Sequence, residues 1–530
     1  MKTAYINGKI FTSDLSNKYV TQMLVEDGKF SKVGEYIDTT NEADEVVDLC
    51  GKTVISGIVD AHMHPLMLAD YSKQIACLPP NINSIEELKS VIANVAKSMK
   101  PNEWILGWGY DEGKYIEGRS PNRWDLDEAA PDNPVFLVRS CEHVRCVNSK
   151  ALKICGITKE TKDIEGGKLE RDEYGELTGK LEENARDLVL PFLPKQTDED
   201  RINALVELGK KLSSQGIVTV ADMGNLHAGG NYEIFVRAAE LGFKQKVSIY
   251  YMWDYFCDDE TFAITEEQRD YGKDVRIAGI KLIGDGSISG KTAWLRKPYL
   301  NTDNYGISVY SDESMEKAIE FAKKNACQIA VHAMGGRAID RVIERMSKEK
   351  DWTDGRIPFV RMEHLTEPSD DAMKNAAKYG FAFACQPIFA YCEIESYKKN
   401  LGEDRIRELY PFKSMLDNGV KMCISTDAPA TSWADPSEPF VNIKAAVTKR
   451  AYDGTDIGYA QKLDVETAII LYTKEAAEIC GLLSTGMIKQ GYDADFVILT
   501  DDIFALESMR IDSIKAEKTY IKGECVFDRK

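Results

Sequence analysis

Residues 55–65, with the sequence ISGIVDAHMHP, decide the fold of this chain because they join a short apolar run to two histidines. An apolar run interrupted only by Gly57 is typical of a strand buried on both faces in a parallel sheet. Successive side chains of a strand point to opposite faces, so His62 and His64 are expected on one face, where one metal ion could bind both. They follow the run, so they should lie at the C-terminal end of the strand, where barrels of parallel strands carry their active sites.

A second interpretation of this pair is that HxH occurs by chance in a strand and that both rings make ordinary hydrogen bonds. The distribution of the other histidines favours the metal site. The chain contains only 6 histidines in 530 residues, and two of the other four also end apolar runs, His332 in IAVHAMG and His364 in FVRMEHL.

Further apolar runs follow at regular intervals from Gly216 onward. They are GIVTVADMG, VSIYYMW, IAGIKLIGDG, CQIAVHAMG, FVRMEHL, FAFACQP and KMCISTDAP, and amphipathic patterns such as NYEIFVRAAELG and ESMEKAIEFAKKN lie between them. Together with the opening run they make eight strand–helix units. The sequence therefore predicts the α/β class and a (β/α)8 TIM-type barrel over residues 55–485.

The two ends of the chain have a different pattern, in which short strand-like runs alternate with tight turns. Asn7-Gly8, Asp27-Gly28, Cys50-Gly51 and Lys522-Gly523 are hairpin signals. Each end alone has too few strands to bury a core, so residues 1–54 and 486–530 are predicted to form one composite β-sandwich domain. Residues 66–212 are mixed and irregular, and are predicted to be a large α/β insertion after the first barrel strand that covers the active site.

Composition restricts the partners and the cellular compartment. The formal net charge is −19 without a long basic run, which argues against nucleic acid or an acidic membrane surface and favours a small-molecule substrate. The 12 cysteines form no CxxC pair, the start MKTAYINGKIF lacks a secretory core, and no apolar run approaches about 18 residues. These features predict a cytoplasmic protein without a membrane span, and they leave a homo-oligomer open.

The polar residues at the predicted strand ends form a set that suits a metal centre. Imidazoles and a carboxylate bind zinc, and also iron or manganese, so the sequence predicts one or two divalent ions with zinc as the first candidate. The residues that should point into one barrel mouth are His62, His64, Lys281, His332, His364 and Asp427.

The chain resembles the amidohydrolase superfamily, and within it the branch of YtcJ-like and N-substituted-formamide-deformylase-like enzymes. The resemblance rests on DAHMHP, KLIGDGSISGKTAWL, HAMGGRAI, RMEHL, STDAP, TKEAAEICG and GYDADFVIL, which span nearly the whole chain. It implies that His62 and His64 bind a more buried metal and that His332 and His364 bind a second one. It also implies that Asp427 contacts the metal and transfers protons, and that Lys281, carboxylated on its nitrogen, bridges the two ions.

Alternatives remain for Lys281, Glu182 and His143. Lys281 could pair with Asp285 or Asp427 and never contact a metal, and Glu182, in LTGKLEENA, could supply a bridging carboxylate or simply begin a helix. His143, in CEHVRCVNSKAL, could belong to a metal knuckle, could be an ordinary packed or surface residue, or could contact substrate, as the resemblance implies. His143 and Asp285 are our candidates for substrate binding.

These residues predict hydrolysis of an amide-type C–N bond by metal-bound hydroxide. A bound cation lowers the pKa of water toward about 7 and polarises a substrate carbonyl. Asp427 would take the water's proton and return it to the departing nitrogen, because an amine anion leaves poorly. Two alternatives are open: action on another bond, as an esterase, lyase or isomerase, and a non-catalytic regulatory protein.

Overall fold

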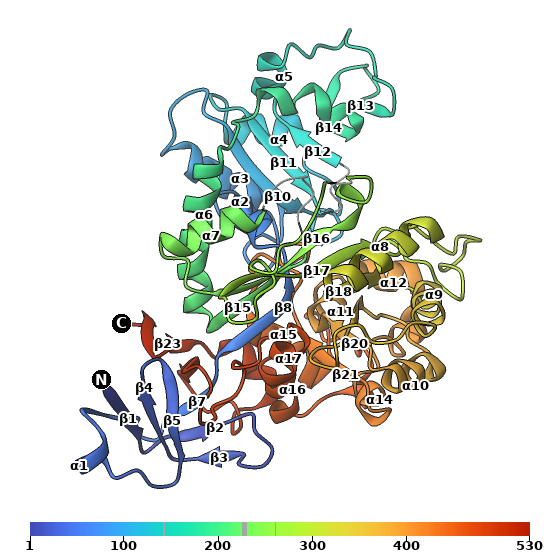
Figure 1. Ribbon diagram of the computed structural model, residues 1–530. Helices are drawn as coiled ribbons and strands as arrows, with labels where there is room; N and C mark the ends of the chain where they lie inside the picture. The colour runs from blue at the N-terminus through green and yellow to red at the C-terminus, as the bar shows by residue number, and fades with distance from the viewer. Residues whose placement is uncertain (141–143, 225–230, 260) are drawn as a thin grey trace. The chain divides into compact units, whose positions relative to one another are not determined.

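The structure is a computed structural model that describes residues 1–140, 144–224, 231–259 and 261–530 (Figure 1). The chain divides into two compact units. The larger comprises Met1–Leu66, Leu205–Thr431 and Ser437–Lys530, and the smaller comprises Met67–Ala204 and Ser432–Pro436. The predicted domain boundaries, and the predicted position of the insertion over the active site, stay predictions.

The larger unit contains an eight-stranded parallel barrel, which confirms the predicted fold class. Its strand order is β21-β20-β19-β18-β17-β16-β15-β8. The strands are the eight apolar runs of the sequence: β8 Ile58–Met63, β15 Ile217–Asp222, β16 Lys246–Met252, β17 Val275–Ile283, β18 Gln328–Ala333, β19 Val360–His364, β20 Ala382–Cys385 and β21 Lys421–Ile424. Just beyond the ends of β8 and β21, the amides of Asp427 and His64 donate to the carbonyls of His62 (2.7 Å) and Ala428 (2.8 Å).

The opening run is two strands rather than one. β7 (Thr53–Ser56) belongs to a different sheet from β8, and the change of sheet occurs at Gly57. A Cβ at Gly57 would stand 2.4 Å from a methyl carbon of Val218, so only glycine fits there. The amide of Gly57 donates to the carbonyl of Asp495 (2.9 Å), a residue from the far end of the chain.

Two further sheets lie outside the barrel, one built from the N-terminal end of the chain and one from both ends. The four-stranded sheet contains β1 Lys2–Ile6, β4 Gln22–Glu26, β5 Lys29–Gly34 and β6 Glu45–Asp48. The six-stranded sheet contains β2 Lys9–Phe11, β3 Tyr19–Val20, β7, β22 Phe496–Leu499, β23 Ala516–Ile521 and β24 Glu524–Asp528. They share one core, which includes Tyr5, Met23 and Phe30 from the first and Ile10, Val54 and Phe496 from the second.

The turn signals in these sheets have mixed outcomes. Asp27-Gly28 joins the antiparallel strands β4 and β5, and Lys522-Gly523 joins β23 and β24, so both are hairpins. Asn7-Gly8 and Cys50-Gly51 instead carry the chain from one sheet to the other, so the hairpin prediction is wrong there. A tight turn requires only a reversal of the chain, and the reversed segment can pair with a different sheet.

Helices follow most of the barrel strands, and several begin with side-chain caps. Ser311 caps α8 by accepting a hydrogen bond from Ser314 N, and Ser369 caps α10 through Ala372 N. The helices of this unit are α1 Thr39–Glu42, α7 Asn231–Glu240, α8 Asp312–Asn325, α9 Gly336–Met346, α10 Asp370–Tyr379, α11 Pro387–Cys392, α12 Ile394–Leu401, α13 Glu403–Ile406, α14 Phe412–Asp417, α15 Pro439–Thr448, α16 Val465–Leu471 and α17 Lys474–Ile479; α2 Pro65–Tyr71 and α6 Asp198–Ser214 cross between the units.

The smaller unit has its own mixed six-stranded sheet and apolar core. Its strand order is β13-β14-β12-β11-β10-β9. The elements are β9 Ile75–Ala76, β10 Ile105–Tyr110, β11 Val135–Arg139, β12 Val144–Val147, β13 Gly167–Arg171, β14 Leu177–Glu183, α3 Ile85–Ala96, α4 Arg123–Ala129 and α5 Ser149–Ile154. Glu182 lies in β14 and pairs with Lys180 (3.0 Å), so it does not begin a helix.

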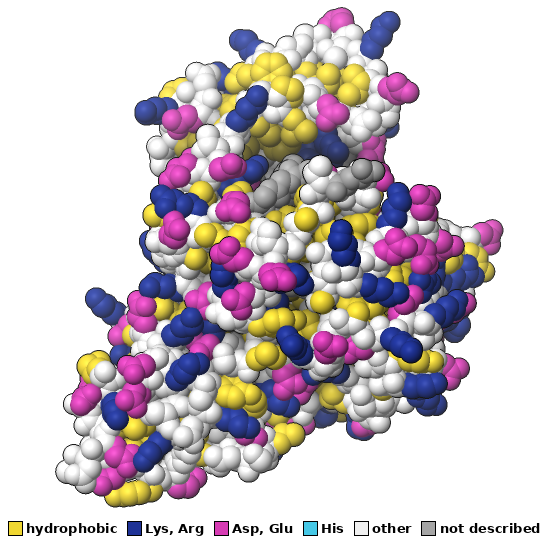
Figure 2. All heavy atoms as spheres, viewed as in Figure 1, with side chains coloured by type: hydrophobic (Ala, Val, Ile, Leu, Met, Phe, Trp, Pro, Cys, Tyr) yellow, Lys and Arg dark blue, Asp and Glu magenta, His cyan; other side chains and the backbone are white. Residues whose placement is uncertain are grey.

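Charged side chains of both signs share the surface, and the absence of nucleic-acid and membrane partners stays a prediction. Lys and Arg side chains alternate with Asp and Glu side chains over the face shown in Figure 2. Among the helices of the described residues, none combines the length and the apolar character needed to span a bilayer.

Candidate metal centre

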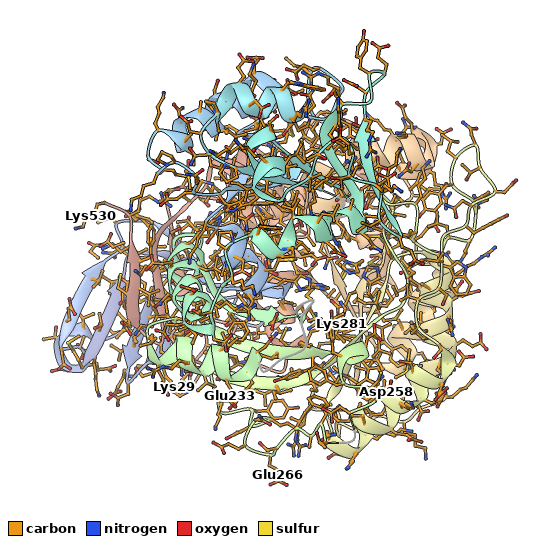
Figure 3. The ribbon with its side chains drawn as sticks, turned by 90° about the horizontal axis from the view of Figure 1, so that it is seen from above. Lys29, Glu233, Asp258, Glu266, Lys281 and Lys530 are labelled. Carbon is orange, nitrogen blue, oxygen red and sulfur yellow. The ribbon has the colours of Figure 1, made fainter. Side chains whose placement is uncertain are left out.

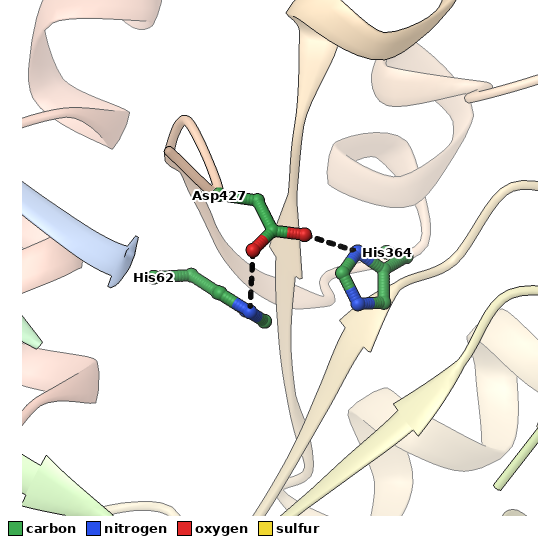
Figure 4. A group of neighbouring side chains, drawn as sticks. All are labelled: His62, His364 and Asp427. Atoms are coloured by element: carbon green, nitrogen blue, oxygen red, sulfur yellow. Dashed lines mark ion pairs between the residues drawn. The ribbon is translucent and has the colours of Figure 1, made fainter. Parts of the chain in front are cut away.

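Two histidines of the first barrel strand converge on one aspartate oxygen. His62 Nε2 lies 3.3 Å and His64 Nε2 lies 3.0 Å from Asp427 Oδ1. His62 is in β8, His64 directly follows it, and Asp427 follows β21, so the closure of the barrel brings them together. Figure 4 shows His62 and Asp427 of this group. The prediction that His62 and His64 share one side of the strand end is confirmed.

The hydrogen bonds of these two rings determine which nitrogen is available. His62 Nδ1 lies 2.7 Å from Glu363 Oε2, and His64 Nδ1 lies 2.6 Å from the carbonyl of Gly224. A carbonyl and an ionised carboxylate only accept hydrogen bonds, so each Nδ1 carries the proton. In the neutral ring, each Nε2 therefore presents a lone pair toward Asp427, the arrangement usual for a histidine that binds a metal.

One carboxylate oxygen of Asp427, Oδ1, is suited to bind a cation. Its Oδ1 is buried and, among the described residues, accepts no hydrogen bond, although it faces the two Nε2 atoms. A carboxylate oxygen opposite two imidazole lone pairs is repulsive unless a positive charge lies between them. Candidate ligand atoms of His62, His364 and Asp427 lie within 4.8 Å of one another (Figure 4), so these residues fit a divalent ion.

The histidines of the fifth and sixth strands lie beside this group. Ring centroids are 5.0 Å apart for His62 and His364, and 4.3 Å apart for His332 and His364. Burial lowers the pKa of His332 to about 4 and that of His364 well below its ordinary value, so both rings stay neutral and able to bind a metal.

Each of these two rings is also held by a hydrogen bond to one nitrogen. His332 Nε2 donates to the carbonyl of Gly286 (2.9 Å), which leaves Nδ1 available. His364 Nδ1 lies 2.7 Å from Gln386 Oε1, and Gln386 Nε2 donates to Ser425 Oγ (2.9 Å). That second bond fixes the amide so that its oxygen accepts, and His364 Nε2 is left available.

Lys281 is buried in β17, and its amine is free of the pairings that the sequence left open. No hydrogen bond or ion pair of the described residues joins Lys281 to Asp285 or Asp427, and its side chain lies among the barrel strands in Figure 3. Burial lowers the pKa of Lys281 to about 8, although the carboxylates of Glu363 and Asp427 oppose the shift. A lysine with this pKa is neutral part of the time near pH 7.5.

Asp285 is a structural centre for the loops after β17 and β18. Its carboxylate accepts hydrogen bonds from the amides of Trp294 (2.8 Å), Met334 (2.9 Å) and Gly335 (2.8 Å). Burial raises its pKa to about 7. Its assignment to substrate binding stays a prediction, and His143, the other candidate, lies outside the described residues.

Sequence reasoning missed Glu363, which holds the His62 ring in place through a hydrogen bond. It accepts from His62 Nδ1 and from Arg361 Nε (2.6 Å), and all three side chains are buried. Strand alternation would turn Glu363 and His364 to opposite faces, but His364 has φ of 79° and Leu365 has φ of 52°, which breaks the alternation. The sequence did contain a signal for this pair, because Arg361 and Glu363 are two charged residues at i and i+2 within an apolar strand.

Replacing Glu363 by glutamine should lower the free energy of unfolding by about 3–5 kcal/mol, because it leaves the Arg361 guanidinium buried without its carboxylate. Urea unfolding measures the change. The control is Glu478→Gln, which removes a half-exposed pair with Lys421 and should cost no more than about 1 kcal/mol. Equal losses in the two variants would show that the buried pair has no special role.

Comparisons with known proteins agree with this geometry. A model of the amidohydrolase family matches residues 45–527. The chain is 28% identical over 541 residues to the putative amidohydrolase YtcJ of Bacillus subtilis, with 100% of both proteins covered. It is 25% identical over 539 residues to the N-substituted formamide deformylase of Arthrobacter pascens, with 99% of this chain and 98% of that enzyme covered.

A solved structure has a similar fold. The crystal structure of an uncharacterized metal-dependent hydrolase from Pyrococcus horikoshii has a TM-score of 0.74 and 25% identity, and the match covers 96% of this chain and 99% of that one. The family model, the full-length relatives and this fold confirm the resemblance drawn from the motifs. The chain belongs to the amidohydrolase family.

Proposed function

We propose that this protein hydrolyses an amide-type C–N bond of a small molecule. As a member of its family it is a metal-dependent hydrolase. The observation that supports a hydrolytic centre is the buried Asp427 Oδ1, which accepts no hydrogen bond from the described residues and faces His62 Nε2 and His64 Nε2.

The donor set fits one or two divalent ions, with zinc as our first candidate. His62, His64 and Asp427 would hold one ion, and His332 and His364 would contribute to a second. When bound, such an ion supplies an activated water and polarises a carbonyl. The imidazole and carboxylate ligands suit zinc, whose preferred ligands are nitrogen, sulfur and carboxylate oxygen.

Asp427 is the proposed proton carrier. The ionised carboxylate of Asp427 can take a proton from the attacking water and then deliver that proton to the departing nitrogen. Asp427 has φ of 59°, a conformation that costs free energy for a residue other than glycine. The amide of Asp427 bonds to His62 O, which helps to hold this conformation at the barrel mouth.

Lys281 is proposed to carry a carboxylate on its nitrogen. The neutral amine, which burial favours, would add to carbon dioxide with formation of an N–C bond and loss of one proton, and the resulting carbamate would offer its two oxygens as metal ligands. Lys281→Ala should therefore lose at least one metal ion per chain, measured by atomic emission. A short carboxylic acid such as propionate should restore part of the metal content, whereas an unchanged metal content in Lys281→Ala would contradict the bridge.

The proposed reaction is tested by metal analysis followed by a substrate panel. The Arthrobacter pascens relative is named an N-substituted formamide deformylase, so N-substituted formamides come first, followed by N-acyl amines and matched esters. Amine release that depends on metal supports the proposal. Turnover of esters alone would favour another bond, and a metal-free protein of normal stability without turnover would favour a regulatory role.

A further inference from the structure

A cavity lies at the end of the barrel strands opposite the metal centre. Its volume is about 280 Å³, and residues of 266–278, 326–327 and 352–356 line it. Arg276 is the second residue of β17, and Cys327 directly precedes β18, so the cavity lies at the N-terminal strand ends. Lys281 and His332, by contrast, lie toward the C-terminal ends of the same strands.

Arg276 brings a buried positive charge to this cavity. Its side chain is only 1% exposed, it stacks 4.5 Å from the Tyr271 ring centroid, and one of its terminal nitrogens donates to the carbonyl of Cys480. Its Nε is buried and has no acceptor within the described part of the chain. A buried guanidinium without a carboxylate is costly, so this group favours an anionic partner.

Two more arginines line the same cavity. Arg269 donates through one terminal nitrogen to the carbonyl of Asn325, but its Nε is also buried without an acceptor among the described residues. Arg356 is exposed. The structure gives no ion pair to Arg269, Arg276 or Arg356 within its described ranges, although the cavity also contains Glu266 and Asp354.

Other arginines of the same unit show that acidic partners are readily found in this acidic chain. Arg345 pairs with Glu316 at 2.5 Å, and Arg405 pairs with Glu367 at 2.6 Å. The three arginines of the cavity share one space and have no such partner among the described residues. Guanidinium groups bind carboxylates and phosphates through paired N–H donors, so the cavity has the chemistry of an oxyanion site.

The wall of the cavity is held in place before any ligand binds. Asp351 accepts hydrogen bonds from the amides of Thr353 (2.7 Å) and Gly355 (2.9 Å), which fixes the loop that carries Arg356. Trp352 Nε1 donates to the carbonyl of Cys327 (2.8 Å). A preorganised wall lowers the entropic cost of binding.

We propose that Arg269, Arg276 and Arg356 form a second ligand site that binds a small phosphate- or carboxylate-bearing molecule. The volume exceeds that of one phosphate group, and the aromatic side chains Tyr271 and Trp352 offer apolar surface to the remainder of the ligand. This site is separate from the metal centre and does not depend on the proposed reaction.

Equilibrium dialysis of the metal-loaded, full-length protein tests the site. The probes are radiolabelled inorganic phosphate and radiolabelled succinate, each at constant ionic strength in chloride. The variants are Arg269→Gln and Arg356→Gln, and the control is Arg510→Gln, which removes an exposed arginine that has no ion pair among the described residues and does not line the cavity. Circular dichroism confirms that each variant is folded.

We expect the parent and Arg510→Gln to bind at least one probe with the same affinity, and Arg269→Gln and Arg356→Gln to bind it at least about tenfold more weakly, because each loses a charge-assisted contact. The probe that binds identifies the anionic group. Phosphate bound only at the metal centre would be equal in all four proteins, and that result, or no binding of either probe to the parent, would overturn the proposal.

Discussion

Asp427→Asn should lower kcat for amide hydrolysis by at least the ~10²-fold that is typical of losing a general acid–base group. Asparagine keeps the size and one oxygen of the side chain, so folding and most of the bound metal should survive. The amide cannot take up a proton from water, which removes the proposed proton carrier. Steady-state kinetics on the substrate found in the panel, together with metal analysis, measure both quantities.

The dependence on the leaving group separates proton transfer from simple distortion. An alkylamine needs a proton to depart, whereas an activated ester releases a stable anion, so the loss in Asp427→Asn should be largest for alkylamides and smaller for activated esters. A control is Asp417→Asn at the end of α14, which alters an exposed carboxylate paired with Lys413. Amide hydrolysis by Asp427→Asn at close to the parental rate would show that Asp427 is structural.

The double variant His62→Ala, His64→Ala should lose metal and at least about 10²-fold of its activity, because loss of a mere outer partner of a metal ligand already costs 10–100-fold. Metal bound to the native state raises the melting temperature. A chelator should therefore lower the melting temperature of the parent and should shift that of the double variant much less.

His332→Ala is the matched comparison for this experiment, because it removes a ring that is assigned to the second ion. If two ions bind, His332→Ala should retain the ion held by His62, His64 and Asp427. Full metal content and turnover in the His62→Ala, His64→Ala variant would show that these residues are not the ligands.

Much of the barrel could be predicted because each of its strands is a short apolar run, and the run reports burial on both faces. His62, His64, His332 and His364 could be chosen because they end such runs, and parallel strands place those ends at one mouth. The structure brings the rings of His62, His64 and His364 to Asp427 and places His332 beside His364.

The parts that could not be predicted depend on contacts between distant segments. Residue 57 must be glycine because Val218 approaches it, and no local pattern contains that contact. Gln386 binds His364 and is itself oriented by a hydrogen bond to Ser425, and these three residues come from the ends of three different strands. Glu363 was missed because a positive φ at His364 allows neighbouring residues to face the same side, which the rule of alternation forbids.

The pairing of β7 with β22 has a consequence for synthesis on the ribosome. β7 ends at Ser56 and its partner β22 begins at Phe496, so about 440 residues must be translated between them. At bacterial to eukaryotic elongation rates of about 5–20 residues per second, this interval is roughly 20 to 90 s. During that time one edge of β7 lacks its partner strand, and such an edge is a template for aggregation. The nascent chain therefore exposes an edge that other chains can pair with until residues 496–499 emerge.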